Sequence, residues 1–438
     1  MSWATRFRLR QYAKASLWIV PLLGLLLGGA LAVAAATAEG ASWLPRTWDY
    51  SATTASSVLS SVVGSMIALL GFVVTIGVLV IQQATGTLSP RYMRLWYRDR
   101  LQKAVLATFT GTFAFSYTLL RSIETNSVPN LGVTLAGVAV AVSLLLLLIY
   151  LNRFTHNLRP VAIADIVARM GERVLDRVAA HLRSHAATGE APRPGGPVDR
   201  IRSERGGVIQ AFDAGGMVAL ATRHDCVLVL AASVGDFVPP GAAVVEVHHG
   251  GSPPDPRRVT ALIALGAERT IEQDPAFALR ILVDIAIRAL SPAVNDPTTA
   301  VQVLNHIEAF LHAVGRVGLH DSHVLADDRG RPRVVVPGRG WADYLELAVT
   351  EIREYGETSL QVCRRLRALL DGLLTALPDD HLPAVRAELA LLDDAVEREF
   401  TDPARRAGAR TSDPQGIGGG RHPRGAPPAE RPSDAPGP

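Results

Sequence analysis

Lysine is almost absent from this sequence, and several chemistries that depend on it are therefore excluded. Lysine occurs only at Lys14 and Lys103, and the rest of the 44 basic residues are arginine. Beyond residue 103 there is no lysine for a nucleotide-phosphate loop, a kinase strand, a pyridoxal Schiff base, or a biotin or lipoyl arm. Cysteine is equally scarce: Cys226 and Cys363 form neither a CxxC pair nor a zinc pattern, and two cysteines cannot build a disulfide framework.

Charge is also scarce. Charged residues make up 19% of the chain, against about 25% in an average soluble domain. Hydrophobic residues make up 48% and the mean hydropathy is +0.20, so the apolar residues must be concentrated in part of the 438-residue chain. The net charge of +3 is too small to favour a nucleic-acid binder. At about 150 residues per domain, the length allows roughly three domains.

Long hydrophobic runs fill the first third of the chain. Residues 17–38, 58–83, 104–120 and 131–151 carry no Asp, Glu, Lys or Arg. Each run is close to the length of about 20 residues that crosses about 30 Å of hydrocarbon. We therefore predict four transmembrane helices in a membrane domain at residues 1–152. The first run is alternatively a cleaved signal peptide, but it is longer than the usual apolar stretch of about 7–15 residues, which favours an uncleaved span.

Basic residues are distributed unevenly around these runs. They gather before the first run and between the second and the third, at Arg6, Arg8, Arg10, Lys14, Arg91, Arg94, Arg98, Arg100 and Lys103. Short cytoplasmic loops accumulate Arg and Lys, so both termini are predicted to be cytoplasmic. The Ala-rich composition and the use of Arg in place of Lys favour a bacterial protein, and hence the inner membrane.

The predicted spans contain small and hydroxyl side chains but no ionisable residue near a mid-span position. Proton relays and voltage sensors keep such residues, so the spans offer no site of that kind. Gly24 and Gly28 lie four residues apart in the first span, and the third span carries a row of hydroxyls. We single out Thr108, Thr112 and Ser116 as a candidate polar face. Such a face serves either tight helix packing or a pore lining.

The remaining chain is predicted to be a cytoplasmic α+β region. An amphipathic helix at 153–186 leaves the membrane and is followed by a linker at 187–206. Short apolar runs between turn residues predict a small β-barrel-like module at 207–249, after which Gly250 to Pro256 form a second linker. Residues 257–400 are predicted to be mainly helical, with a polar loop or hairpin at 326–340. The Pro/Gly-rich segment at 401–438 is predicted to be a disordered tail.

One predicted helix carries charges in a regular pattern. Asp274-Pro275 and Asp296-Pro297 each predict a capped helix start. Arg280, Asp284 and Arg288 follow at i, i+4 and i+8, where they can pair along one stripe. The alternative is a polar pocket that binds an anion or supplies acid/base groups. Its candidate residues are Arg269, Glu272, Asp274, Arg280, Asp284, Arg288, Ser291, Asn295 and Asp296, and this interpretation requires them to converge on one open cleft.

Metal and cofactor sites are not predicted. The 12 histidines include His248-His249, His306, His312, His320 and His323, but none lies in an HExxH motif or a cysteine-bearing zinc pattern. No GxSxG elbow and no GxGxxG phosphate loop occur either.

Two blocks of this sequence have a familiar pattern. Residues 266–274 and 282–300 include the run Leu-Ser-Pro-Ala-Val-Asn-Asp-Pro that ends at Pro297. Together with Ser89-Pro90-Arg91, 234–241 and 351–356, they resemble the DUF2254 family of predicted bacterial membrane proteins. The resemblance extends from about residue 15 to about residue 400. It implies a multi-span membrane protein with a cytoplasmic domain, and it implies no particular activity.

Two function hypotheses follow from these patterns. The first is a homo-oligomeric, non-enzymatic membrane protein, channel-like in its most specific version, whose cytoplasmic domain regulates or scaffolds the membrane part. The second is a membrane-tethered ligand sensor or enzyme with an Arg/Asp-lined anion site. The expected partners are the lipid bilayer, further copies of the chain and an unidentified small molecule, but no nucleic acid.

Overall fold

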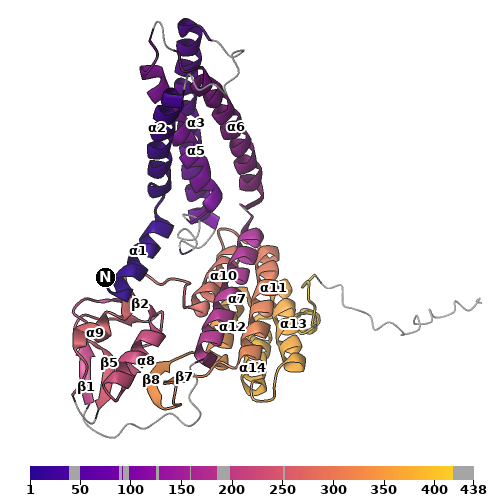
Figure 1. The fold of residues 1–438 in the computed structure, drawn as a ribbon. Helices are drawn as coiled ribbons and strands as arrows, with labels where there is room; N and C mark the ends of the chain where they lie inside the picture. Colours follow the sequence, from indigo (N-terminus) through magenta and orange to yellow (C-terminus); the bar gives the residue numbers. More distant parts are fainter. Residues whose placement is uncertain are drawn as a thin grey trace, which may run out of the picture.

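A membrane-like helix bundle stands on a larger mixed region in the computed structural model (Figure 1). The structure describes residues 1–38, 50–87, 91, 98–124, 128–157, 159–184, 198–249 and 252–417. Below the bundle, a part rich in strands and a part built from helices lie side by side (Figure 1).

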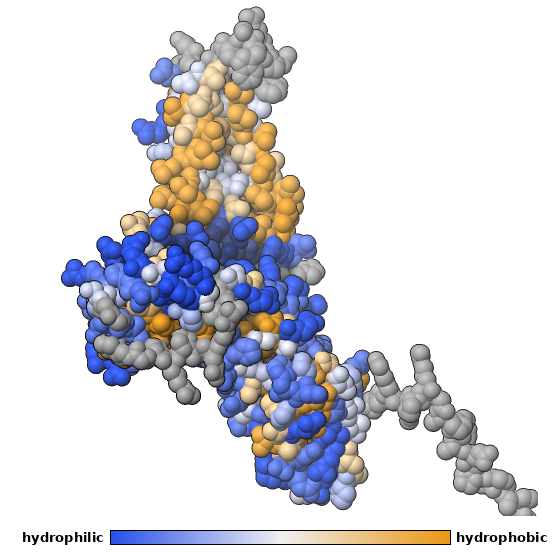
Figure 2. All heavy atoms as spheres, turned by 60° about the horizontal axis from the view of Figure 1, so that its bottom comes forward, coloured by the Kyte–Doolittle hydropathy of each residue, from blue (hydrophilic) through white to orange (hydrophobic). Residues whose placement is uncertain are grey.

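Among the described residues, four long helices form the upper bundle. They are α2 (Ile19–Ala38), α3 (Ala52–Thr87), α5 (Arg100–Arg121) and α6 (Asn130–Asn157). Within the described residues, three segments are long and apolar enough to cross a membrane: Ile19–Ala38, Ala52–Leu79 and Asn130–Arg153. Apolar side chains cover the outside of the bundle, whereas polar ones begin sharply at its junction with the lower region (Figure 2).

Three of the four helices predicted as spans are long and apolar enough to cross a membrane, so the predicted number of four is not confirmed. α5 does not reach the same apolarity because Thr and Ser side chains follow one another along it. It packs against α2, α3 and α6 and buries Phe109, Phe115 and Leu119 among them. An inner helix of a bundle faces other helices more than lipid, so it needs fewer apolar side chains.

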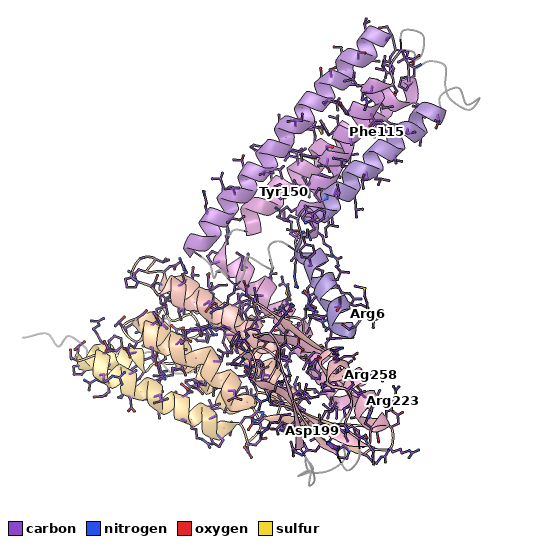
Figure 3. The ribbon with its side chains drawn as sticks, turned by 90° about the vertical axis from the view of Figure 1, so that its left-hand side faces the viewer. Arg6, Phe115, Tyr150, Asp199, Arg223 and Arg258 are labelled. Atoms are coloured by element: carbon purple, nitrogen blue, oxygen red, sulfur yellow. The ribbon has the colours of Figure 1, made fainter. Side chains whose placement is uncertain are left out.

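Helix α1 (Trp3–Ala15) links the upper bundle to the strand-rich part. The Ser2 hydroxyl accepts a hydrogen bond from the Thr5 backbone N–H and so caps the helix. The backbone N–H of Ala4 donates to the carbonyl of Ala261 at 3.0 Å, which fixes the start of α1 on the lower region. Arg6 of α1 lies along the same edge of the molecule as Arg223 and Arg258 (Figure 3).

The helical part has one continuous apolar core. Its helices are α7 (Pro160–Ser184), α10 (Pro275–Ala289), α11 (Pro297–Val317), α12 (Trp341–Gly356), α13 (Leu360–Ala376), α14 (Leu382–Glu399) and α15 (Pro403–Ala409). Asp274 and Asp296 cap α10 and α11, as the sequence predicts. The apolar face of α7 packs on α10 and α11. The predicted amphipathic helix after the membrane domain is therefore a member of this bundle.

The strand-rich part contains two open sheets. Its elements are β1 (Val198–Arg202), β2 (Gly207–Phe212), α8 (Ala214–Arg223), β3 (Cys226–Leu230), β4 (Phe237–Val238), β5 (Ala243–His249), α9 (Pro256–Thr260), β6 (Ile263–Gly266), β7 (Ser322–Ala326) and β8 (Pro332–Pro337). One sheet has the order β1-β5-β3-β8-β7, and only the β3/β8 pair is parallel. The other has the order β4-β2-β6 and is antiparallel.

The β-barrel-like module predicted at 207–249 is not confirmed, because neither sheet closes in the described residues. The larger sheet includes β8, from the loop or hairpin predicted at 326–340, and β7, which lies just before that segment. The apolar run Met217 to Leu220 forms helix α8 and not a strand. The Asp213 carboxylate caps it by accepting from the Gly216 backbone N–H at 3.1 Å, and a short apolar run alone does not distinguish helix from strand.

Two further boundaries differ from the sequence prediction. Strand β1 lies inside the segment predicted as a linker, where it pairs with β5. The predicted disordered tail begins with α15, which is fixed to α13 because Arg364 Nε donates to the Gly408 carbonyl at 2.7 Å. Residues 418–438 of that tail lie outside the described residues.

Candidate functional site

The start of α10 holds a buried ion pair. The Asp274 carboxylate accepts from the Phe277 backbone N–H at 3.1 Å and from Arg269 Nε at 2.8 Å. The Asp274 side chain is only 2% exposed. Burial raises the pKa of Asp274 above its usual value, although the Arg269 guanidinium acts in the opposite direction. Asp274 thus serves as a helix cap and as the partner of Arg269.

A glycine turn closes over this ion pair. Gly235 has a φ of +97°, a conformation that favours glycine. A Cβ atom at this position would collide with the Asp274 carboxylate. The next residue, Asp236, accepts a hydrogen bond from Arg339 Nη2 at 2.9 Å. The turn within the 234–241 segment therefore brings a second ion pair to the start of α10.

A cavity of about 340 Å³ adjoins these two ion pairs. It lies where the helical part meets the strand-rich part. Its walls come from α7, the end of β2, the turn before β4, the start of α10, the segment after β8, and α12. The volume is at the small end of the range of about 300–1,000 Å³ that is typical of ligand pockets. Glu272 and Asp274 are the two predicted candidate residues that line it.

Glu272 connects this cavity to the segments next to the membrane. Its carboxylate lies 3.2 Å from Lys14 Nζ and 3.0 Å from Arg98 Nη1. Lys14 belongs to α1, and Arg98 directly precedes the cap of α5. Burial acts to raise the pKa of Glu272, but Lys14, Gln11 and Arg98 outweigh it and hold the pKa below its usual value. Glu272 is therefore an ionised anchor for two membrane-side segments.

Asp284 forms a second connection, in the middle of α10. Arg280 Nε donates to its carboxylate at 2.9 Å, and Arg91, from the segment after α3, pairs with the other carboxylate oxygen. Arg280 also binds Glu351 of α12 through both of its terminal nitrogens, one of them at 2.9 Å. The hydrogen bond from Arg280 lowers the pKa of Glu351. The result is a chain of charges from a membrane-side segment to α12.

The last candidate residues have local structural roles. The Ser291 hydroxyl donates to the Arg288 carbonyl at 2.7 Å. Asn295 turns the chain with a φ of +47°, and Asp296 caps α11 by accepting from the Thr299 backbone N–H at 3.0 Å. These contacts end one helix and start the next.

The nine candidates therefore do not converge on one open cleft, as the pocket interpretation required. A helix rises about 1.5 Å per residue, so Asp274 and Asp284 lie about 15 Å apart along α10, and Arg288 lies about 6 Å further on. Arg269 and Asp274 pair with each other beside the cavity, whereas Arg280 and Asp284 pair with each other away from it. Arg280 and Asp284 thus form one i, i+4 ion pair on α10, and the cavity adjoins the start of this helix.

The candidate polar face in the membrane bundle lies between helices. The hydroxyls of Thr112 in α5 and Ser143 in α6 are 3.2 Å apart, Ser116 is fully buried, and Thr108 is half-buried. A Cβ atom at Gly24 or Gly28 would collide with the backbone of α5. Tight helix packing accounts for the Gly24 and Gly28 contacts. Thr108 and Thr112 also line a mainly apolar cavity of about 530 Å³ between α2, α5 and α6.

Metal-site geometry is absent from the part of the chain that the structure describes, where no three His, Cys, Asp or Glu side chains gather to hold an ion. Both cysteines are buried, and burial raises the pKa of the Cys363 thiol to about 12. A thiol with so high a pKa is a poor nucleophile.

Comparison with known proteins places the chain in a family. Residues 14–372 match DUF2254, which is described as a predicted membrane protein. The chain belongs to this family. It is 30% identical over 413 residues to the uncharacterized protein Rv1290c of Mycobacterium tuberculosis and, likewise, to the uncharacterized protein Mb1321c of Mycobacterium bovis. Each alignment covers 90% of this chain and 79% of the relative. No solved structure matches the chain.

The DUF2254 match confirms the resemblance expected from the sequence and makes this chain a membrane protein in contact with a lipid bilayer. The matched residues include α10, the Asp284 and Glu272 contacts and the cavity walls up to Tyr344.

Sequence reasoning on this DUF2254 chain missed most of the polar cavity residues. They are Arg177, His181, Ser233, Gln273, His323, Arg339 and Tyr344. They come from elements far apart in the sequence, and none belongs to a recognisable motif. A local signal existed only for Gln273, within the block 266–274, and for the neighbouring Gly235-Asp236 turn, within 234–241, since both segments carry the family resemblance.

Proposed function

We propose that this DUF2254 chain is a non-enzymatic bacterial inner-membrane protein whose cytoplasmic domain regulates its membrane helices. The proposal rests on one observation: basic side chains from the membrane-side segments form ion pairs with acidic side chains of the lower domain. Lys14 and Arg98 reach Glu272, and Arg91 reaches Asp284.

The proposal includes α5 as the fourth span. Its 22 residues would extend about 33 Å as a helix, which matches the hydrocarbon thickness. Charged residues, Arg100 and Arg121, stand at its two ends. Its inner position in the bundle supports crossing together with α2, α3 and α6.

The proposed orientation has both termini in the cytoplasm. Lys14, Arg91 and Arg98 lie on the side of the bundle that meets the lower domain. Cation-rich loops are retained in the cytoplasm, so the domain that contacts them is assigned to the same side.

Homo-oligomerisation remains part of the proposal, but conduction does not. Space is open around Gly64 and Gly71 on α3, where a Cβ atom would meet nothing within 4 Å. This supports close approach of a second copy. Thr112 contacts Ser143 between helices, and the cavity that Thr108 and Thr112 line has mainly apolar walls, which does not favour a hydroxyl-lined pore. The mass of the purified protein in nanodiscs tests the oligomer, because a monomeric mass would contradict it.

Hydrogen exchange of the full-length protein in nanodiscs tests the regulatory contact. In the double variant Glu272→Gln, Asp284→Asn, we expect faster amide exchange in α1 and in the first turn of α5, because both segments lose their acidic partners. Glu397→Gln is a matched control, since within the described residues this half-exposed acid pairs with Arg406 and Arg410 near the end of the helical part. If amide exchange in α1 and α5 is as slow in the double variant as in the wild type, the proposal is refuted.

Ligand sensing is a second candidate function, and the cavity favours it. Glu272 lines the cavity and also holds Lys14 and Arg98. A molecule bound in the cavity would therefore act directly on the anchor of α1 and α5.

A further inference from the structure

The cavity beside α10 has mainly apolar walls. Val178 and Leu182 of α7, Phe212 at the end of β2, and Leu319 and Val336 contribute to them. Such walls favour a ligand with an apolar body over a fully polar metabolite, because burying polar groups without partners is unfavourable.

The acids around this cavity are already engaged by cations. Asp274 binds Arg269, Glu272 binds Lys14 and Arg98, and Asp236 binds Arg339. A cationic ligand would have to compete with these ion pairs. The acidic side chains of the wall therefore do not constitute a free cation site.

Two hydrogen-bond donors at the cavity, unlike these acids, form no ion pair with a described side chain. Tyr344 is 3% exposed, yet within the described residues its hydroxyl makes no hydrogen bond. Tyr344 lines the cavity, so this hydroxyl can donate to a ligand bound there. Arg177 on α7 donates its Nε to the Arg173 carbonyl but forms no ion pair with a described side chain. Both groups can donate a hydrogen bond to an oxygen atom of a ligand.

We propose that this cavity binds a small monocarboxylate with an apolar body, with Tyr344 and Arg177 as donors to the carboxylate. The inference deepens the proposed function by naming the ligand class of the sensing site. One guanidinium and one phenol hydroxyl match a single negative charge, whereas a phosphate dianion is usually held by several cations or by a helix N-terminus. A short fatty acid and a phenyl-substituted acid share this chemistry.

Binding to the full-length protein in nanodiscs of zwitterionic lipid tests the site. The probes are butanoate, hexanoate and 3-phenylpropanoate, measured by calorimetry against empty nanodiscs, with hexanamide as the uncharged counterpart. We expect binding to tighten about fourfold per added methylene from butanoate to hexanoate, as apolar burial predicts. Hexanamide should bind at least tenfold more weakly than hexanoate. A higher affinity for 3-phenylpropanoate than for hexanoate would identify an aromatic acid as the better ligand within the proposed class.

Matched variants test the two donors. Tyr344→Phe and Arg177→Gln should each weaken hexanoate binding by about tenfold or more, the usual effect of losing a hydrogen bond to a charged group. Tyr355→Phe on the same helix α12 and Arg173→Gln one turn earlier on α7 are controls, because neither side chain lines the cavity. Equal binding to wild type and Tyr344→Phe, or equal affinity for hexanoate and hexanamide, would overturn the assignment.

The same samples separate this inference from the proposed function. If hexanoate fails to bind while Asp284→Asn and Glu272→Gln still loosen α1 and α5, the ligand assignment is wrong and the regulatory contact stands. If hexanoate binds as expected while the double variant leaves α1 and α5 unchanged, the site stands and the regulatory function is wrong.

Discussion

Replacement of Asp284 by asparagine probes the contact between the membrane-side segments and α10. Asp284 is 9% exposed and binds Arg280 and Arg91, which are 21% and 49% exposed. Asn keeps the shape but removes the charge. Breaking a fully buried pair costs about 3–5 kcal/mol, whereas an exposed pair contributes about 0.2–1 kcal/mol. Because Arg280 keeps Glu351 and Arg91 is half-exposed, we expect an intermediate loss of about 2 kcal/mol.

Amide exchange of α10 measures this loss. A decrease of about 2 kcal/mol in local opening free energy accelerates exchange about 30-fold. Asp165→Asn is the control, because Asp165 pairs with Arg169 on the surface of α7 and both are more than one-third exposed. Its loss should cost only about 0.3–0.5 kcal/mol. If Asp284→Asn changed exchange in α10 no more than Asp165→Asn changes it in α7, the assignment of Asp284 as a central contact would be refuted.

Three further outcomes are expected. Gly28→Ala should lower the thermal stability of the detergent-solubilised protein, because its Cβ would collide with the α5 backbone, whereas Gly64→Ala should leave a monomer unaffected. Burial acts to raise the pKa of Glu272, but the neighbouring cations hold it below its ordinary value of about 4.3. The contacts of Glu272 therefore stabilise the protein above that pH, and they are lost as the pH falls through the lowered pKa. A spin label at position 10 should therefore become more mobile in acid, and the same label in Glu272→Gln should show no such transition. A fluorescent reporter fused to the carboxyl end should be active in the cytoplasm, and a periplasmic-only signal would contradict the proposed orientation.

The membrane helices and the helix caps could be predicted because their signals are local. The apolar run at 17–38 contains α2, and the Asp-Pro pairs at 274 and 296 begin α10 and α11. Apolarity and capping depend on neighbouring residues alone. α5 was harder to assign because its hydroxyl side chains lower its apolarity. One of them, Thr112, contacts Ser143 of the neighbouring helix α6, and the sequence of α5 alone does not reveal this contact.

The cavity could not be predicted because its walls meet only in the folded chain. Arg177 and Tyr344 belong to α7 and α12, which come together around α10. The sequence also grouped Asp274 with Asp284 and Arg288, since all three are close along the chain. The rise of the helix separates them. The residues expected in one cleft are therefore divided between the cavity, the ion pairs in the middle of α10 and the two helix ends that follow.

The proposed regulatory role requires contacts of moderate strength at Glu272 and at Asp284 of α10. α10 is buried along most of its length and packs against α7, α11 and α12, so a shift at its start also moves Asp284. Allosteric coupling between two sites is typically about 1–3 kcal/mol. The pairs of Arg91 with Asp284 and of Lys14 with Glu272 are each half-exposed on the cation side, which limits their strength to the lower part of that range. If the proposed function is correct, pairs of this kind would allow a ligand of modest affinity to release the membrane-side segments, whereas a fully buried pair would hold them too firmly to respond.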